Sequence, residues 1–199
     1  MAEYGDATAL IVVDMQHDFA DPTGSLYVRG GERTVAPIAA EIAAARAAGA
    51  TVVFTQDWHP EHTPHFAVDG GIWPVHCVMG TPGAELVPGL LPAGGEPGHL
   101  VRKGSGPEDG YSGFSVLDIV TGERKGTELQ TILESAGVRE LVVVGLAGDW
   151  CVKATAIDGA ELDYPVTVPL PLTRFVELEA GDTDRAVAAM RDAGVTVVE

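Results

Sequence analysis

Short, almost purely apolar runs separated by stretches of helical periodicity constrain this chain more than any other sequence feature. Six segments have the pattern of buried strands, and the third and sixth are weaker than the others: ALIVVD (9–14), TVVFTQD (51–57), HLVRKG (99–104), ELVVVGL (140–146), PVTVPL (165–170) and the C-terminal TVVE. A strand without an alternating polar face must be covered on both sides, as in a parallel sheet.

Four of the intervening segments carry an apolar stripe at helical spacing: 32–48, 127–136, 149–163 and 182–193. Strand and helix therefore alternate, which predicts an α/β fold of three layers, α/β/α, with a mainly parallel sheet between helices. The length of 199 residues predicts one domain spanning 1–199. The Pro- and Gly-rich segment of about 57–98 is a long excursion between two strands, and loops of that length are usually functional or disordered.

Charge and composition narrow the classes of partner. The formal net charge is −17, which argues against a nucleic-acid backbone or an anionic membrane as partner. No apolar run is long enough for a membrane helix, and the first twenty residues lack the features of a signal peptide. The two cysteines are expected to be free thiols in a reducing cytoplasm. The sequence leaves the oligomeric state open, a homo-oligomer included.

Reactive residues fall where the predicted strands end. Asp14 ends the first strand, Asp57 the second and Lys103 the third, and Cys151 opens the helix after the fourth. Ligands of open parallel sheets bind beyond the carboxyl ends of the strands, so these four side chains are expected to converge on one rim.

Cys151 is the most informative of them. A thiol in the first turn of a helix is favoured as thiolate, Lys103 would act in the same direction, and Asp14 could accept the thiol proton. The loop LAGDWC would also offer backbone N–H groups to an oxyanion. Taken singly, each residue has a simpler interpretation: Cys151 as a small buried hydrophobe, Asp14 as a turn residue and Lys103 as a solvated side chain. Their convergence favours catalysis, whereas Cys77 is expected to be structural.

The stretch QDWHPEHTPHF (56–66) and the following IWPVHC gather most of the histidines of the chain. A carboxylate and three imidazoles suit one divalent ion such as zinc, iron or manganese, and the predicted ligands are Asp57, His59, His65 and His76. The alternative is a proton relay or a set of surface groups. We expect the remaining three histidines to be solvated: His17, His62 and His99.

The metal could activate water, or it could anchor a substrate for the thiol. The convergence of Lys103 and Asp14 favours the role of anchor.

These residues resemble the isochorismatase-like cysteine hydrolases, and within them the nicotinamidases (pyrazinamidases). The resemblance spans nearly the whole chain through motifs in a specific order: VVDMQHDF (12–19), QDWHP and HF (56–66), GIWPVHCVMGTPGAEL (71–86), RKG (102–104), DGYSGF (109–114) and VVVGLAGDWCVKATA (142–156). It implies a six-stranded sheet with strand order 3-2-1-4-5-6. It also implies hydrolysis of nicotinamide, or pyrazinamide, to the acid and ammonia through a thioester, a step of NAD salvage.

The resemblance further assigns roles to individual residues. It implies a catalytic triad of Asp14, Lys103 and Cys151, and an oxyanion hole formed by the N–H groups of Ala147 and Cys151 after a cis peptide bond at Leu146–Ala147. It implies that the predicted histidines and Asp57 hold the metal, which binds the ring nitrogen of a small pyridine carboxamide. The side chains that would line the ring pocket are Phe19, Trp73 and Tyr111.

Three departures from the family pattern bear on rate and substrate preference. The usual Ala-Thr-Asp-x-Cys loop has Gly148 in place of threonine, Trp150 is bulky for the position before the nucleophile, and the segment 170–183 replaces a shorter Asp-Leu-Thr-Ala-Gly run. The alternatives are therefore a related hydrolase of another small molecule, or a catalytically weak member that binds a metal or ligand.

Overall fold

A parallel sheet forms the centre of the structure, a computed structural model that describes residues 3–199. The strands along the sheet are β3 (His99–Lys103), β2 (Thr51–Asp57), β1 (Thr8–Val13), β6 (Glu140–Leu146), β7 (Val166–Pro169) and β9 (Thr196–Val198), and each pairs in parallel with its neighbour. With the predicted strands numbered along the chain, this is the order 3-2-1-4-5-6. The predicted strand order is confirmed, as is the α/β class.

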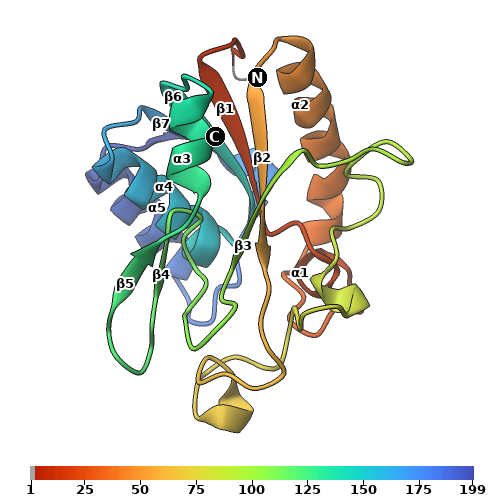
Figure 1. The fold of residues 1–199 in the computed structure, drawn as a ribbon, viewed down its shortest axis with the longest axis vertical. Helices are drawn as coiled ribbons and strands as arrows, with labels where there is room; N and C mark the ends of the chain where they lie inside the picture. Colours follow the sequence, from red (N-terminus) through yellow and green to blue (C-terminus); the bar gives the residue numbers. More distant parts are fainter. Residues whose placement is uncertain (1–2) are drawn as a thin grey trace.

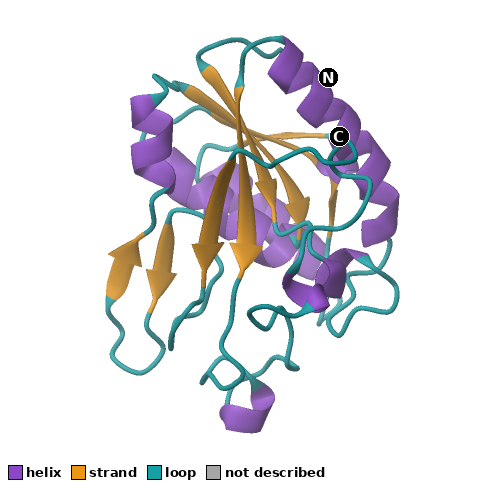
Figure 2. Cartoon of the chain, turned by 45° about the vertical axis from the view of Figure 1, so that its right-hand side comes forward, coloured by secondary structure: helices purple, strands orange, loops and turns teal. Residues whose placement is uncertain are grey.

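Helices cover both faces of this sheet (Figures 1 and 2). The main helices are α2 (Val35–Ala47), α3 (Leu129–Ser135), α4 (Lys153–Glu161) and α5 (Asp182–Asp192), each within a segment predicted to be helical. A short helix, α1 (His17–Ala20), follows β1, and a 3-10 turn, η1 (Gly31–Thr34), precedes α2.

The alternation of side chains along β1 divides the hydrophobic core in two. Leu10 and Val12 point to one face, where they pack in a cluster with Ile38 and Ile42 of α2. The intervening Ala9, Ile11 and Val13 belong to a second cluster, with side chains of α3, α4 and α5. All six residues of β1 are buried, since a strand between two helical layers has no solvent-facing side. This is the physical reason for the continuous apolar run in the sequence.

Three strands of the described chain were not predicted from the sequence. A short strand, β8 (Thr173–Arg174), pairs with the end of β6, and β4 (Ser115–Leu117) and β5 (Arg124–Gly126) form a separate antiparallel pair. These strands have only two or three residues, too few for an alternating or apolar pattern to stand out.

The long excursion after β2 first forms loops beyond the carboxyl ends of the strands, at the bottom of Figure 1, and then runs back past α1 and α2 to the start of β3. It has two single 3-10 turns, η2 (Ala67–Asp69) and η3 (Pro82–Ala84). Among residues 3–199, no helix is long and apolar enough to cross a membrane.

Candidate active site

The carboxyl ends of β1, β2 and β3 bring Asp14, Asp57 and Lys103 together, as predicted. Cys151 reaches the same rim from a π-helical turn, η4 (Gly148–Val152), which leads into α4. One oxygen each of Asp14 and Asp57 and the sulfur of Cys151 all lie within 4.8 Å of one another. Each of the four side chains is buried, so their charges interact with little screening by water.

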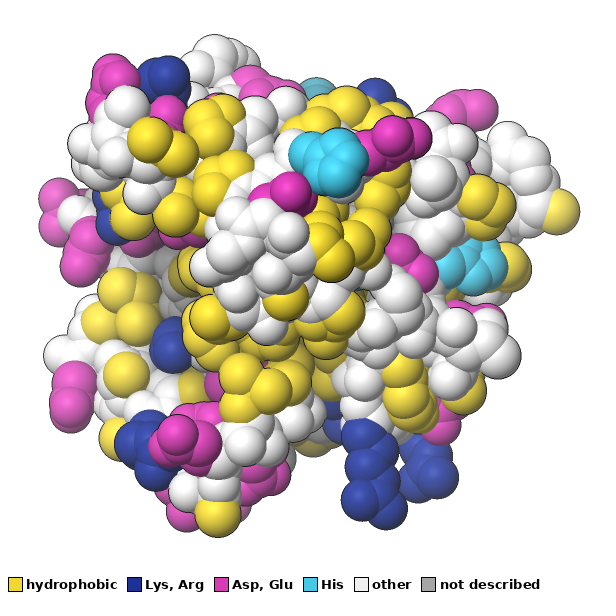
Figure 3. Space-filling view, turned by 90° about the horizontal axis from the view of Figure 1, so that it is seen from below, with side chains coloured by type: hydrophobic (Ala, Val, Ile, Leu, Met, Phe, Trp, Pro, Cys, Tyr) yellow, Lys and Arg dark blue, Asp and Glu magenta, His cyan; other side chains and the backbone are white. Residues whose placement is uncertain are grey.

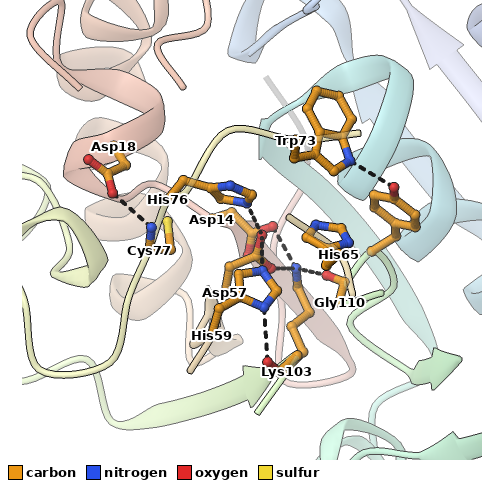
Figure 4. Close-up of polar contacts among 12 residues, drawn as sticks. Asp14, Asp18, Asp57, His59, His65, Trp73, His76, Cys77, Lys103 and Gly110 are labelled. Carbon is orange, nitrogen blue, oxygen red and sulfur yellow. Dashed lines mark hydrogen bonds and ion pairs between the residues drawn. The ribbon is translucent and has the colours of Figure 1, made fainter. Parts of the chain in front are cut away.

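Lys103 holds the two carboxylates together (Figure 4). Its Nζ donates a hydrogen bond of 2.7 Å to Oδ2 of Asp14, and further hydrogen bonds to Oδ1 of Asp57 and to the backbone oxygen of Gly110. Burial alone would lower the pKa of Lys103, but the charges of Asp14 and Asp57 outweigh it and raise that pKa well above its usual value. Lys103 is therefore a permanent ammonium group that occupies all three of its donor positions.

Asp14 has the character of a base that works near neutral pH. Burial raises its pKa to about 6, against the opposing effect of Lys103. Thr55 donates a hydrogen bond of 2.6 Å to Oδ1 of Asp14 and accepts one from its backbone N–H, which fixes the orientation of the carboxylate. A general base is most effective when its pKa lies near the working pH.

Burial has the largest effect on the pKa of the Cys151 thiol. Lys103 favours the thiolate, as predicted, but burial and the two nearby carboxylates raise the pKa of Cys151 well above its usual value. The helix end and Lys103 therefore do not ionise this thiol by themselves. An acceptor for its proton is required, and Asp14 is close enough to provide it.

The turn before Cys151 has the backbone that the family resemblance implies. The peptide bond between Leu146 and Ala147 is cis. The carbonyl oxygen of Ala147 accepts hydrogen bonds from the N–H groups of Trp150 and Val152, which folds the turn back on itself. Ala147 lines the same cavity as His65 and His76.

Three histidines form a second cluster beside the first. One ring nitrogen of each of His59, His65 and His76 lies within 4.8 Å of the others, and all three side chains are buried. Nδ1 of His59 lies 2.9 Å from the backbone oxygen of Gly104, and Nδ1 of His76 lies 2.7 Å from that of Pro74. Since a carbonyl oxygen only accepts, both Nδ1 atoms carry the proton and both Nε2 atoms offer a lone pair.

Asp57 connects the two clusters. Its Oδ1 bonds to Lys103, while its Oδ2 lies 3.6 Å from Nε2 of His59 and 3.8 Å from Nε2 of His76 (Figure 4). Burial would raise the pKa of Asp57, but Lys103 and the two imidazoles hold it well below its usual value, so this carboxylate stays ionised.

The donor set fits a divalent metal ion. Nε2 of His59 is a buried polar atom without a hydrogen-bond partner in the described part of the chain, which is costly unless a cation accepts its lone pair. Burial and the neighbouring His59 lower the pKa of His65 to about 3, so its ring is neutral and able to bind a metal. The three histidines thus share one centre, and Asp57 faces two of them, which supports a divalent ion.

The residues predicted to lie outside the site do so. His62 and His99 are exposed, and His17 is partly exposed. Cys77 is buried, and its sulfur lies 3.9 Å from the backbone oxygen of Gly83, while its N–H donates to Asp18. This agrees with the structural role predicted for Cys77.

A narrow cavity that opens to solvent lies beside the two clusters. The predicted ring-pocket residues Phe19, Trp73 and Tyr111 all line it, and Nε1 of Trp73 donates a hydrogen bond of 2.9 Å to the hydroxyl of Tyr111. Trp150 completes this wall, because its ring packs 4.8 Å from that of Trp73 and 5.1 Å from that of Tyr111. A small volume with apolar walls suits one aromatic ring rather than an extended ligand.

The sequence did not reveal all of the residues that shape the site. Leu26, Val28 and Val176 also line the cavity, and nothing in their local sequence distinguishes them from other apolar residues. Gln16 is different, since it lies within the motif VVDMQHDF. Its buried side chain bonds both the N–H (2.8 Å) and the carbonyl (2.7 Å) of Asp57 and so fixes the backbone of that ligand.

The face that carries this rim is shown in Figure 3, viewed from below Figure 1. Hydrophobic side chains gather in the middle of this face, among scattered acidic ones. Exposed apolar residues occur on the excursion after β2, Val68 and Ile72, and on the turn between β4 and β5, Ile119 and Val120.

Comparisons with known proteins agree with this geometry. The family model described as "Isochorismatase domain" matches residues 8–199. The nicotinamidase/pyrazinamidase of Mycobacterium tuberculosis is 38% identical, over 96% of this chain and 97% of that protein. Among solved structures, the pyrazinamidase of Pyrococcus horikoshii in complex with zinc has a TM-score of 0.84 at 36% identity, covering 97% of this chain and 99% of that one. PnC1 of L. infantum in complex with nicotinate has a TM-score of 0.87 at 36% identity, covering 100% of this chain and 96% of that one. The chain therefore belongs to the isochorismatase domain family, with nicotinamidases and pyrazinamidases among its relatives.

Proposed function

We propose that this protein is a metal-dependent cysteine amidohydrolase that converts nicotinamide, and also pyrazinamide, to the corresponding acid and ammonia. One observation carries the proposal: the buried cluster of Asp14, Lys103 and Cys151 lies next to three histidines whose ring nitrogens lie within 4.8 Å of one another, and two of these histidines line a cavity with aromatic walls. Relatives named nicotinamidase or pyrazinamidase, over nearly the full length of the chain, support the same reaction.

In the first half of the proposed reaction, Asp14 accepts the proton of the Cys151 thiol, and the sulfur attacks the amide carbon. The oxyanion that forms accepts hydrogen bonds from the N–H groups of Ala147 and Cys151. Asp14 then gives its proton to the amide nitrogen, the C–N bond breaks, and ammonia leaves a thioester on Cys151.

In the second half, Asp14 accepts a proton from a water molecule, whose oxygen attacks the thioester carbon. The C–S bond breaks, the acid is released, and the sulfur of Cys151 recovers its proton from Asp14. Lys103 remains an ammonium group throughout, since its hydrogen bonds to Asp14 and Asp57 orient the base and balance the two carboxylates. Each role is a proposal that the contacts of the cluster support.

We propose zinc as the metal, held by Asp57, His59, His65 and His76. The zinc complex of the P. horikoshii relative and the neutral imidazoles both support this choice. When bound, the ion supplies a Lewis-acidic position for the nitrogen of the substrate ring. The contribution of the chain is to keep the four ligand groups in place, through the hydrogen bonds of His59 to Gly104 and of His76 to Pro74.

We further propose that residues 1–199 act as one catalytic domain in the cytoplasm. Two free, buried cysteines support a reducing compartment. The catalytically weak alternative was suggested by Trp150, but the structure places this ring in the wall of the cavity, against Trp73 and Tyr111.

Ammonia release from a panel of small amides, with metal analysis of the same sample, tests the proposal. We expect turnover of nicotinamide and pyrazinamide, slower or absent turnover of benzamide, and about one equivalent of divalent metal per chain. Benzamide lacks the ring nitrogen but has the same shape. Turnover of none of these amides would contradict the proposed function, and equal turnover of benzamide would contradict the role of the metal.

A further inference from the structure

Residues 175–177, which we call the wall segment, follow β8 and form part of the cavity without belonging to any strand or helix. Val176 lines the cavity together with Ala147 and Trp150 of the oxyanion loop. The segment lies within the part of the chain that departs from the family pattern. Its position depends on contacts with the oxyanion loop.

Asp149 ties the wall segment to the oxyanion loop. Its carboxylate is only 3% exposed and accepts two backbone hydrogen bonds, one of 3.0 Å from Val176 and one of 2.8 Å from Glu177. Glu177 has a φ of +54°, which a residue with a side chain seldom adopts without support. The two backbone hydrogen bonds to the buried carboxylate of Asp149 supply that support.

Gly148 and Phe175 fit each other in a second contact between the same two segments. A Cβ atom built on Gly148 would lie 2.5 Å from Cε1 and 2.7 Å from Cδ1 of the Phe175 ring, closer than real Cβ contacts allow. The ring thus occupies the space that a side chain at position 148 would need. Gly148 and the segment that carries Phe175 are therefore fitted to each other in this chain.

We propose that the wall segment is a specificity determinant, in which Val176 limits the size of the substrate ring. Three residues position this segment: Asp149, Gly148 and Phe175. The inference rests on the amide hydrolysis proposed above and deepens it. The preferred substrates are carboxamides of six-membered nitrogen heterocycles that carry no substituent on the side of the ring facing Val176. A methyl group on the side of the ring that meets Val176 is excluded, because the two hydrogen bonds to Asp149 keep this wall from moving away.

The first experiment compares kcat/KM for nicotinamide with kcat/KM for ring-methylated nicotinamides. The ratio of kcat/KM for nicotinamide to kcat/KM for the methylated amide is expected to fall by about tenfold in Val176→Ala, for at least one methyl position. One or two methyl groups change kcat/KM by about this factor in a fitted pocket. Asp149→Asn is expected to lower the same ratio, because an amide keeps the shape but cannot accept both hydrogen bonds.

Asp118→Asn is a control for the change from carboxylate to amide in Asp149→Asn. Asp118 is also buried and accepts two backbone hydrogen bonds, of 2.9 Å from Val120 and 2.8 Å from Thr121, on a turn that does not line the cavity. Both bonds end on Oδ1 of Asp118, so an asparagine there can keep them, whereas those of Asp149 end on its two different oxygens. Its substitution should leave the ratio as in the unchanged protein. If Asp149→Asn does not fold, Val176→Ala still tests the wall.

The second experiment is a double-mutant cycle between positions 148 and 175. Gly148→Ala is expected to displace the ring of Phe175 and to lower kcat/KM for nicotinamide by about tenfold, chiefly through KM, the size of effect that a misplaced wall has in a fitted pocket. In the double variant with Phe175→Ala the clash is gone, so most of this loss should be recovered.

The proposal is overturned if Val176→Ala and Asp149→Asn keep the unchanged ratio, or if Phe175→Ala fails to rescue Gly148→Ala. Calorimetric binding of nicotinate and its ring-methylated forms separates this outcome from a failure of the proposed function. A protein that binds nicotinate more tightly than its methylated forms, releases no ammonia and loses this preference in Val176→Ala retains the wall but not the reaction. Equal binding of both acids by the unchanged protein contradicts the wall itself.

Discussion

Lys103 donates a hydrogen bond to Oδ1 of Asp57, the carboxylate whose other oxygen faces His59 and His76. The same ammonium group bonds Asp14, so one side chain joins the proposed catalytic base to the proposed metal site. The thiol chemistry and the position of the substrate ring are therefore coupled through a single buried charge.

Removal of that charge should destabilise the fold. In Lys103→Met, the carboxylates of Asp14 and Asp57 remain buried side by side without a counter-charge. We expect the free energy of unfolding to fall by about 3–5 kcal/mol, the usual cost of breaking a buried ion pair. Urea unfolding of the metal-free protein measures it.

The double variant Lys103→Met with Asp14→Asn provides the control for this prediction. It removes one positive and one negative charge together, so it should be less destabilised than the sum of the two single variants. Strict additivity would mean that Lys103 and Asp14 do not interact as the structure indicates.

The pH dependence of kcat/KM should report Asp14. Burial raises its pKa to about 6. Above that pH the carboxylate is ionised and can accept the thiol proton, whereas below it the position is already protonated. Activity should therefore be lost as the pH falls through about 6. The pKa of His65 is about 3, so protonation of this metal ligand comes only at lower pH.

A steady-state pH profile between pH 4 and 8 tests this prediction. Lys103 and Cys151 both have pKa values raised well above their usual ones, so neither should produce a second step in this range. A profile that is flat down to pH 4 would exclude Asp14 as the base.

The metal content should depend on a glycine that binds no metal. Gly104 has a φ of +72°, and a Cβ atom there would collide with the ring of His59. Gly104→Ala is therefore expected to displace His59 and to lower the metal content and raise KM. Gly94→Ala is the matched control, because Gly94 has a φ of +73° and nothing within 4 Å of its Cβ position. Equal metal content in the two variants would contradict the role given to His59.

Removal of the metal should weaken the binding of nicotinamide. Chelation is expected to raise KM for nicotinamide by at least about tenfold, since ring orientation is worth several kcal/mol in favourable cases. Added zinc should restore the original KM. An unchanged KM in a protein shown by metal analysis to be free of metal would exclude the anchor role.

Much of the fold and the site could be predicted from sequence because both depend on short-range patterns. The run ALIVVD marks a strand buried on both faces, and its end places Asp14 on the rim. The same rule applied to Asp57 and Lys103 predicted the cluster, because parallel strands end at one edge. The predicted metal ligands followed from residue type and spacing in the excursion after β2.

The features that the sequence did not reveal depend on contacts between distant segments. Phe175 occupies the space beside Gly148, and Gln16 holds the backbone of Asp57, over separations of 27 and 41 residues. No local pattern encodes such a contact. The balance of effects on the pKa of Cys151 was also hidden from the sequence, because burial outweighs the effect of Lys103 and depends on the packing of the whole site.

Loss of the nucleophile should separate binding from chemistry. Cys151→Ala is expected to lower the rate of ammonia release by about four orders of magnitude or more, as removal of a nucleophile does elsewhere, while nicotinate still binds. Cys77→Ala is the matched control, since Cys77 is the other buried thiol and its sulfur bonds only Gly83. Comparable loss in both variants would indicate damage to the fold.

The most direct measurement is the covalent state of Cys151 during turnover. The reaction with nicotinamide is quenched in acid within the first turnovers, and the protein is digested and analysed by mass spectrometry. The account predicts one nicotinoyl group on the peptide that contains Cys151, and none on that of Cys77 or in the Asp14→Asn variant. Ammonia release without any acylated Cys151, or with the acyl group on another residue, would contradict it.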